Sequence, residues 1–222
     1  MKQGQLVVID GPEGAGKTTQ LRLLEDVLPH RYDLDFVFTR EPGGTPFANH
    51  VRSLVLHDDA SDAVGVELIQ AYGAARFHHV RTLVLPAMLA GKTVVCDRFD
   101  AITFAYQVVA QQGGEGALAF YDLQRKTLER LFTNSGASIW TTIILDIPVD
   151  VTKERLALRG AMNHFDRRLP EFYERAREGF RQYKCRYPSR THVLCGALTP
   201  ALVHQDIIDV FDRVLGGPAR RA

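Results

Sequence analysis

Cysteine, net charge and long apolar runs are scarce in this sequence of 222 residues, and each scarcity excludes a class of protein. The three cysteines, Cys96, Cys185 and Cys195, are far apart and form no Cys-x-x-Cys pair. A disulfide framework or a zinc site is therefore not expected, and a reducing cytoplasm is the expected location. The formal net charge is only +1, so nothing indicates a nucleic-acid or membrane partner.

No stretch approaches the roughly 18 apolar residues that a membrane helix needs. The opening MKQGQLVVIDG also lacks the apolar core and cleavage site of a signal peptide. What is present is an ordinary globular composition, with 45% hydrophobic and 24% charged residues. We expect one domain over residues 1–216, followed by a Gly/Pro/Arg-rich tail, 217–222, that is disordered.

Short β-branched runs alternate with longer helical ones, which favours a three-layer α/β sandwich with a five-stranded parallel sheet flanked by helices. Strands are expected at 6–10, 35–39, 93–97, 141–147 and 192–195. Helices are expected at 17–28, 46–56, 66–90 with an interruption near Pro86, 103–111, 116–134, 149–159, 170–187 and 200–215.

The first expected strand is followed by the segment GPEGAGKT, which matches the phosphate-binding pattern G-x-x-x-x-G-K-[ST]. Its glycines allow backbone N–H groups to wrap nucleotide phosphates, and the following helix N-terminus adds favourable partial charge. Lys17 is expected to reach the β- and γ-phosphates, and the Thr18 hydroxyl to bind the Mg²⁺ carried by ATP. The predicted ATP-binding residues are Gly11, Pro12, Glu13, Gly14, Ala15, Gly16, Lys17, Thr18 and Thr19.

At the end of the second expected strand lies TREPGGT, residues 39–45. Ligands of open α/β sheets bind beyond the carboxyl ends of the strands, although a solvated charged turn is the alternative interpretation. The segment resembles, nearly letter for letter, the signature of the bacterial thymidylate kinase family. The resemblance extends along almost the whole chain, through YGAAR (72–76), DRF (97–99), AYQ (105–107), an arginine-bearing lid and the final helix.

This resemblance implies a P-loop kinase with a short lid at about 155–169 that moves the γ-phosphoryl group of ATP onto dTMP. It also implies Mg²⁺ as cofactor and a homodimer. Asp97 and Arg98 look like the family's Asp-Arg pair, with Asp97 near the Mg²⁺ and Arg98 on the acceptor phosphate; a structural ion pair is the alternative. Arg40 and Arg52 match arginines near that phosphate, although Arg52 could instead be an exposed helix arginine.

The resemblance also assigns the acceptor nucleoside. Tyr72 matches an aromatic that stacks on the thymine ring, and Arg76, four residues later on one helix face, an arginine that bonds a pyrimidine carbonyl. Gln107 matches the residue that reads the edge of the base, with Thr103 one turn earlier. The alternative interpretation of the first pair is core packing for Tyr72 and a surface charge for Arg76.

The sugar is assigned to two further residues by the same resemblance. Tyr106 looks like the aromatic that crowds the 2′ position, although an ordinary buried tyrosine is the alternative. Glu13 lies inside the phosphate-binding loop, where a carboxylate would repel a triphosphate unless it faces elsewhere. In the family an acidic residue there points toward the acceptor sugar and its 3′-hydroxyl.

Some family members carry a catalytic arginine inside the phosphate-binding loop, where this chain has Gly14 and Ala15. The segment 155–168, RLALRGAMNHFDRR, resembles the lid that supplies this arginine instead, with Arg159 as the first candidate and Arg155 as the second. The lid is shorter than the family's, and no glycine-rich stretch follows Gln107.

Three alternatives remain open at this point. The chain could be another nucleotide or nucleoside kinase, or a weakly active homologue with an altered lid. It could also be a P-loop switch, although it has no N-K-x-D guanine-reading motif. His57, His78 and His79 are expected to be surface or packing residues, and no metal site beyond the nucleotide-borne Mg²⁺ is expected.

Overall fold

Five parallel strands form the centre of the computed structural model, which describes residues 3–57, 63, 65–159 (without the Arg159 side chain) and 169–217. The strands are β1 (Leu6–Asp10), β2 (Phe36–Arg40), β3 (Thr93–Asp97), β4 (Thr141–Asp146) and β5 (Thr191–Cys195). Their order is β2-β3-β1-β4-β5, and every neighbouring pair is parallel. The predicted five-stranded parallel sheet is therefore confirmed, and four of the ten strand ends are shifted by one residue: both ends of β2, the end of β4 and the start of β5.

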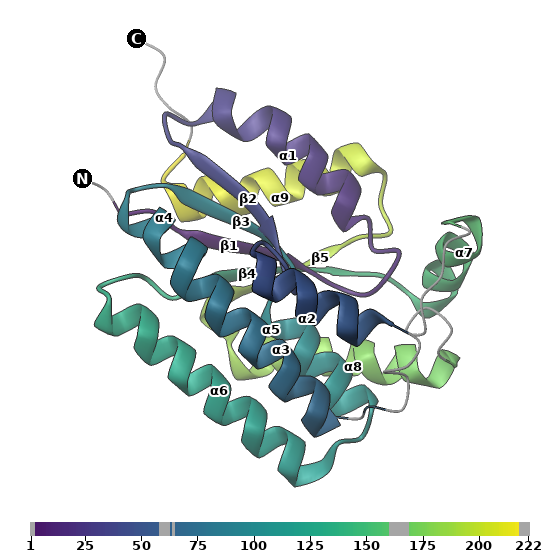
Figure 1. Ribbon diagram of the computed structural model, residues 1–222. Helices are drawn as coiled ribbons and strands as arrows, with labels where there is room; N and C mark the ends of the chain where they lie inside the picture. The colour runs from purple at the N-terminus through teal and green to yellow at the C-terminus, as the bar shows by residue number, and fades with distance from the viewer. Residues whose placement is uncertain (1–2, 58–62, 64, 160–168, 218–222) are drawn as a thin grey trace.

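Helices cover both faces of the sheet (Figure 1). One face carries α1 (Lys17–Arg31) and α9 (Pro200–Leu215). The other carries α3 (Gly65–His79), α4 (Leu85–Leu89), α6 (Gly114–Asn134) and α8 (Pro170–Arg186), with α2 (Pro46–Leu56) packed against α3. The structure also contains the short helices α5 (Asp100–Thr103) and α7 (Val149–Arg159), the 3₁₀ turn η4 (Pro188–Arg190) and two π-helical segments described below.

The central strand β1 is buried over its whole length, as expected for a strand covered on both sides. Because successive side chains point to opposite faces, Val7 and Ile9 join the apolar cluster under α1 and α9. Leu6 and Val8 join a second cluster, built with Leu128 of α6 and with the segment before α4. The strand is thereby held rigidly, and its carboxyl end carries the phosphate-binding loop.

The helix expected at 66–90 is interrupted near Pro86, as predicted, and the interruption lies just before the proline. A π-helical segment, η2 (Val80–Val84), follows α3, and the Leu85 N–H donates to the carbonyl of Val80, five residues earlier. Proline cannot donate a backbone hydrogen bond. The wider turn places Pro86 in the first turn of α4, where no such donor is needed, so the helix continues through it.

Several helix boundaries differ from the sequence prediction by one to three residues; α6, for example, begins at Gly114 and not at residue 116. Helix α1 continues past Pro29 and ends at Arg31, whereas the sequence predicts an end at Leu28. The helix expected at 103–111 is α5 followed by a π-helical segment, η3 (Phe104–Ala110). The η3 segment packs on α8, a contact between distant parts of the chain that helix propensity does not describe.

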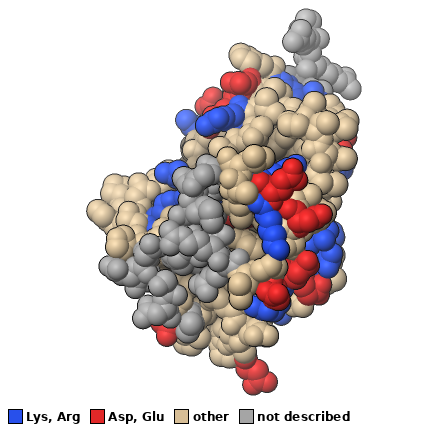
Figure 2. Space-filling model, turned by 90° about the vertical axis from the view of Figure 1, so that its right-hand side faces the viewer, with Lys and Arg blue, Asp and Glu red and all other residues tan. Residues whose placement is uncertain are grey.

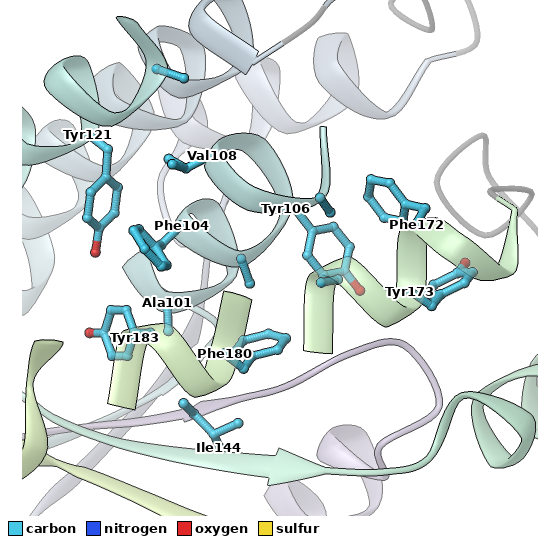
Figure 3. Close-up of a cluster of buried hydrophobic side chains, with 14 of the residues drawn as sticks. Ala101, Phe104, Tyr106, Val108, Tyr121, Ile144, Phe172, Tyr173, Phe180 and Tyr183 are labelled. Carbon is cyan, nitrogen blue, oxygen red and sulfur yellow. The ribbon is translucent and has the colours of Figure 1, made fainter. Parts of the chain in front are cut away.

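The η3 segment lies against α8 in an aromatic cluster drawn from both elements (Figure 3). Tyr106 and Phe172 meet edge to face with ring centroids 5.2 Å apart. Gly179 makes the close approach possible, because a Cβ there would lie 2.6 Å from the Cα of Ala105. This contact fixes the position of η3, which carries two of the predicted acceptor-site residues.

Of the expected lid, residues 160–168 lie outside the described residues, as do residues 218–222 of the expected tail. In the described part of the chain, no helix has the length and apolarity that a membrane span requires.

On the face shown in Figure 2, acidic and basic side chains are interleaved without forming a large patch of one sign.

Candidate active site

The carboxyl ends of the three strands β1, β2 and β3 carry the candidate site. In a parallel sheet these ends meet at one edge, where ligands bind. The phosphate-binding loop follows β1, Arg98 follows β3, and the turn at Pro42 follows β2. Gly11 has φ 137° and its backbone passes so close to β4 that a Cβ would lie 2.5 Å from the Leu145 carbonyl oxygen. Glycine is therefore required where the loop begins.

Beside the loop lies a hollow of about 550 Å³. Its walls come from the loop, the start of α1, the end of β3 and the turn before α9, and it is lined by Glu13, Gly14, Ala15, Gly16, Lys17, Thr18, Thr19, Gln20, Arg52, Asp97, Arg98, Arg155, Gly196, Leu198, Pro200 and Val203. We call it the donor hollow. It brings together seven of the nine predicted ATP-binding residues; Gly11 and Pro12 do not line it.

Lys17 is buried within this loop. Its Nζ donates hydrogen bonds of 2.8 Å and 2.6 Å to the carbonyl oxygens of Gly11 and Pro12. Burial, followed by the nearby Arg98 guanidinium, lowers the pKa of the lysine to about 8. An anionic phosphate in the hollow would favour the charged form, because an opposite charge raises the pKa of an amine.

Thr18 and Asp97 both line the donor hollow. The Oδ1 atom of Asp97 is buried and has no hydrogen-bond partner among the described residues. An oxygen in that condition fits a cation, since buried carboxylate oxygens are otherwise paired. Hydroxyl and carboxylate oxygens are the donors that Mg²⁺ prefers, so the residues present fit a nucleotide-borne Mg²⁺. The described residues contain no group of three or more His, Cys, Asp or Glu that could hold a metal ion by themselves.

A second, smaller cavity of about 100 Å³ lies next to the donor hollow. It is lined by Glu13, Glu41, Pro42, Arg52, Leu56, Tyr72, Arg76, Arg98, Phe99, Ile102, Thr103, Tyr106 and Gln107. We call it the acceptor pocket. Glu13, Arg52 and Arg98 line both cavities, so two ligands would meet at a carboxylate and two guanidinium groups.

Arg98 lies at this junction with a backbone φ of 68°, a conformation that residues other than glycine rarely adopt. Its N–H donates to the Ile9 carbonyl at 2.9 Å, and its Nη2 donates to Glu13 Oε1 at 2.9 Å. The hydroxyl of Tyr106 donates to the other Glu13 oxygen. Burial alone would raise the pKa of the Glu13 carboxyl, but Arg98 and then Lys17 outweigh it and hold that pKa below its ordinary value.

Asp10 connects the two loops that meet there. The N–H of Gly11 donates to its Oδ1 at 2.9 Å, and those of Phe99 and Ile102 donate to its Oδ2 at 3.2 Å and 3.1 Å. The carboxyl is fully buried, and burial raises its pKa to about 6, against the opposing effect of Arg98. Asp10 therefore ties the phosphate-binding loop to the segment that carries Arg98.

The guanidinium groups of Arg40, Arg52 and Arg98 are close enough to affect one another electrostatically. Burial, followed by the charges of Arg40 and Arg98, lowers the pKa of Arg52. The Arg52 Nη1 donates to the Pro42 carbonyl at 3.1 Å, which directs this side chain over the pocket. Mutual repulsion of this kind is relieved by a bound dianion, and guanidinium groups fit phosphate oxygens.

The acceptor pocket also contains uncharged polar and aromatic side chains around a buried arginine, Arg76, which is paired with the buried carboxylate of Glu41. Gln107 and Thr103 are buried, and Tyr72 is half-buried. Arg76 is 4% exposed, and its Nη2 donates to the Phe99 carbonyl at 2.6 Å and to Thr103 Oγ1 at 2.9 Å. An amide, a hydroxyl and a guanidinium beside an aromatic ring can recognise a flat heterocycle by stacking and hydrogen bonds.

Comparison with known proteins agrees with this geometry. A family model described as thymidylate kinase matches residues 9–207. The chain is 36% identical over 219 residues to the thymidylate kinase of Pseudomonas putida (strain GB-1), with 98% of each chain covered. It is 37% identical over 191 residues to the thymidylate kinase of Exiguobacterium sibiricum, with 86% of each covered. The chain belongs to the thymidylate kinase family.

A solved structure of this family supports the same assignment. The crystal structure of thymidylate kinase from Ehrlichia chaffeensis matches with a TM-score of 0.70 and 28% identity, over 95% of this chain and 99% of that one. The protein is therefore a P-loop phosphotransferase that binds ATP, in a family that generally uses Mg-ATP.

Not every residue predicted for a thymidylate kinase site lies in the acceptor pocket. Arg40 is exposed and lines a separate hollow that it shares with Asp97 and Asn49. Arg155 lines the donor hollow, where its Nη1 donates to the carbonyls of Gly14 and Gly196 at 2.9 Å and 3.1 Å. The Arg159 side chain, the first catalytic candidate of the thymidylate kinase lid, lies outside the described residues.

Sequence reasoning missed Asp10 and His79 at this thymidylate kinase site, and it placed Glu41 at the ligand-binding edge of the sheet without a role. In the sequence pattern, Asp10 is only the last residue of a strand. The prediction of surface or packing roles for His78 and His79 is incomplete, because His79 is fully buried and bonded to Glu41. The spacing of Arg76 and His79, three apart on one helix face, was the available signal.

Proposed function

We propose that the protein transfers the γ-phosphoryl group of ATP to dTMP, giving dTDP and ADP in dTTP biosynthesis. The observation that carries this proposal is the shared wall of Glu13, Arg52 and Arg98 between donor hollow and acceptor pocket. Phosphoryl transfer requires two phosphates in line and charge neutralisation between them, and little covalent chemistry from the protein. Membership of the thymidylate kinase family supports dTMP as the acceptor.

On the donor side, backbone N–H groups of residues 13–18 would hold the triphosphate, and Lys17 would leave its two carbonyl partners for the β- and γ-phosphates. Thr18 and Asp97 would hold the Mg²⁺, directly or through water. When bound, Mg²⁺ neutralises phosphate charge and orients the transferred group. The buried Asp97 oxygen without a partner supports this assignment.

On the acceptor side, Arg98 and Arg52 would bind the monophosphate, with Arg40 adding long-range attraction from the rim. The thymine ring would stack on Tyr72, with Arg76 and Gln107 bonding its polar edge and Thr103 holding Arg76. The cavity suits one pyrimidine better than a purine, because its volume is only about 100 Å³.

At the sugar, Glu13 would accept a hydrogen bond from the 3′-hydroxyl. Tyr106 would occupy the space beside C2′, because its hydroxyl bond to Glu13 and its edge contact with Phe172 fix the ring. A ribose 2′-hydroxyl would then be crowded. This arrangement favours a deoxyribonucleotide.

During transfer, a lid arginine would neutralise the charge that develops on the moving phosphoryl group. Arg155 already lies in the donor hollow, held by two carbonyl oxygens that a phosphate could replace. Arg159, one helical turn later, is the other candidate.

The deciding experiment is ADP release from Mg-ATP with a panel of acceptors: dTMP, dUMP, UMP, CMP, AMP, GMP and thymidine. Fastest turnover of dTMP, abolished by EDTA and restored by Mg²⁺, is the expected result. Faster turnover of another monophosphate would contradict the acceptor assignment. ATP binding without any turnover would indicate a homologue whose altered lid has lost the activity.

The protein is proposed to act as a homodimer in the cytoplasm. Four large apolar side chains are exposed on α2 and α6, which flank α3: Phe47 and Leu54 on α2, Phe120 and Leu123 on α6. Phe47 and Leu54 are seven residues apart, two turns along one side of α2, and the Phe47 ring lies 5.0 Å from that of His78 on α3. Exposed large apolar side chains of this kind are typical of a subunit interface.

A further inference from the structure

His79 is a buried polar residue to which the proposed reaction assigns no role. It is the last residue of α3, directly before the π-helical segment η2, and it is 0% exposed. A fully buried imidazole is costly unless its nitrogens are bonded. Both of them are: Nε2 lies 2.9 Å from Thr39 Oγ1, and Nδ1 lies 2.8 Å from Glu41 Oε1.

Glu41 connects this histidine to the acceptor pocket. Its Oε2 accepts a 2.7 Å hydrogen bond from Arg76 Nε, and the carboxylate is 3% exposed. Arg76 and His79 are three residues apart on α3, so one carboxylate can bond both side chains across a single helical turn. Burial alone would lower the pKa of Arg76, but Glu41 and then Asp100 outweigh it and keep that pKa above its ordinary value.

The directions of these bonds follow from the chemistry of the groups. A carboxylate only accepts hydrogen bonds, so the Nδ1 of His79 must carry the proton that faces Glu41. The backbone of Gly44 covers the other side: a Cβ there would lie 2.6 Å from His79 Nε2 and 2.5 Å from Thr39 Oγ1. Gly44 therefore keeps water from the hydrogen bond between His79 Nε2 and Thr39, and the two hydrogen bonds together give the imidazole ring one orientation.

These bonds determine which nitrogens of the Arg76 guanidinium are occupied. Glu41 accepts a hydrogen bond from Nε, and the Phe99 carbonyl and Thr103 Oγ1 accept hydrogen bonds from Nη2. Nη1 is left as the guanidinium nitrogen to which the described residues give no partner, and Arg76 lines the acceptor pocket. The hydrogen bonds that connect Thr39, His79 and Glu41 thus leave the Nη1 side of Arg76 available to a ligand.

We propose that His79 is a positioning residue for the acceptor base. Through Glu41 it orients Arg76 so that Nη1 donates to a carbonyl of a pyrimidine, and it thereby contributes to the preference for a base with a carbonyl over one with an amino group at that position. The inference rests on the proposed function, because the base it concerns is that of dTMP.

Two substitutions separate positioning from packing. In His79→Asn the amide nitrogen replaces Nδ1 and can still donate to Glu41. In His79→Gln the amide replaces Nε2, so the Thr39 contact is kept and the Glu41 contact is lost. Both remove the ring, so a role confined to packing would change both variants alike. His50→Gln, at an exposed site on α2, is the control.

The measurements are the calorimetric Kd for dTMP, KM for dTMP and for ATP, and the ratio of kcat/KM for dTMP over dCMP. His79→Gln is expected to weaken dTMP binding and lower that ratio by about tenfold each, with KM for ATP unchanged. His79→Asn is expected within about threefold of the wild type in all of them. Equal losses in the two variants, or no loss in either, would overturn the inference.

The wild-type data distinguish this outcome from failure of the proposed function. If the wild type neither binds nor phosphorylates dTMP, the proposed function is wrong and the inference falls with it. If the wild type phosphorylates dTMP and His79→Gln binds it equally well, only the positioning role is wrong.

Discussion

Arg98 combines a functional side chain with an unfavourable backbone conformation. Its φ of 68° costs an L-residue roughly 1–2 kcal/mol, whereas glycine adopts it freely. The Ile9 carbonyl and the Asp10 carboxylate bind the backbone N–H groups of residues 98 and 99 and stabilise this conformation. In this backbone conformation the Arg98 guanidinium contacts Glu13, at the wall that the two cavities share.

Arg98→Ala and Arg98→Gly are therefore expected to lose activity together and to differ in stability. Either change removes the guanidinium, so kcat/KM for dTMP should fall about a thousandfold. Urea unfolding should show the glycine variant to be about 1 kcal/mol more stable than the alanine variant, because only alanine retains the backbone strain. Equal stability of the two would show that the left-handed conformation is not maintained in solution.

Asp10 gives the stability of the protein a pH dependence whose sign is fixed. Burial raises its pKa in the folded state to about 6 from 3.8. The folded state therefore binds this proton more tightly than the unfolded state, and the stabilisation is fully present below pH 3.8 and lost as the pH rises through about 6. Its size is on the order of 2–3 kcal/mol.

The substitution Asp10→Asn removes this titration. The asparagine amide has only one oxygen, so it cannot accept the hydrogen bonds that both carboxylate oxygens of Asp10 accept. The variant should be less stable than the wild type, and its deficit should shrink between pH 4 and pH 7, by on the order of 2 kcal/mol. Urea unfolding of both proteins at several pH values measures the difference. A deficit that grows with pH would contradict the raised pKa.

At the scale of elements, the contact between α8 and η3 positions the acceptor side. Gly179 is the point of closest approach: a Cβ there would also lie 3.1 Å from Val109 Cβ and 3.0 Å from the Ala105 carbonyl oxygen. Ala105 directly precedes Tyr106 and Gln107, so a displacement of η3 would move both side chains.

Gly179→Ala is expected to destabilise the fold by about 1–3 kcal/mol and to raise KM for dTMP more than KM for ATP. Gly116→Ala on α6 is the matched control, because a Cβ there meets nothing within 4 Å. It should stabilise the protein by about 0.5–1 kcal/mol, the ordinary gain of alanine over glycine in a helix. Chemical unfolding and steady-state kinetics of both variants test the contrast; equal effects would show that α8 and η3 are not tightly packed.

At the scale of the whole molecule, the exposed apolar side chains of α2 and α6 predict self-association. Light scattering should give roughly twice the chain mass of 24.8 kDa. Leu54→Glu and Leu123→Glu, at positions 66% and 62% exposed, should shift the protein toward the monomer. Leu202→Glu on α9 is the control, since this 54% exposed leucine lies on the opposite face of the sheet. A monomeric wild type would refute the homodimer.

The sequence by itself determined the sheet, the phosphate-binding loop and the family. These are encoded locally: a buried β-branched strand, a glycine pattern and a helix start lie next to one another in the chain, and TREPGGT is specific in seven residues. Element types followed for the same reason, because period and length distinguish strands from helices without knowledge of their neighbours.

Only the tertiary structure decided which residues share a wall and which groups hold the site residues in place. Glu13 and Arg98 are 85 positions apart, and Glu41 and His79 are 38 apart, so their pairing depends on strand order and helix packing. Local propensity also does not describe the π-helical segments η2, which ends two residues before Pro86, and η3, which packs on α8. A buried carboxylate or imidazole acquires its role from the groups that replace water around it, and those groups come from distant parts of the chain.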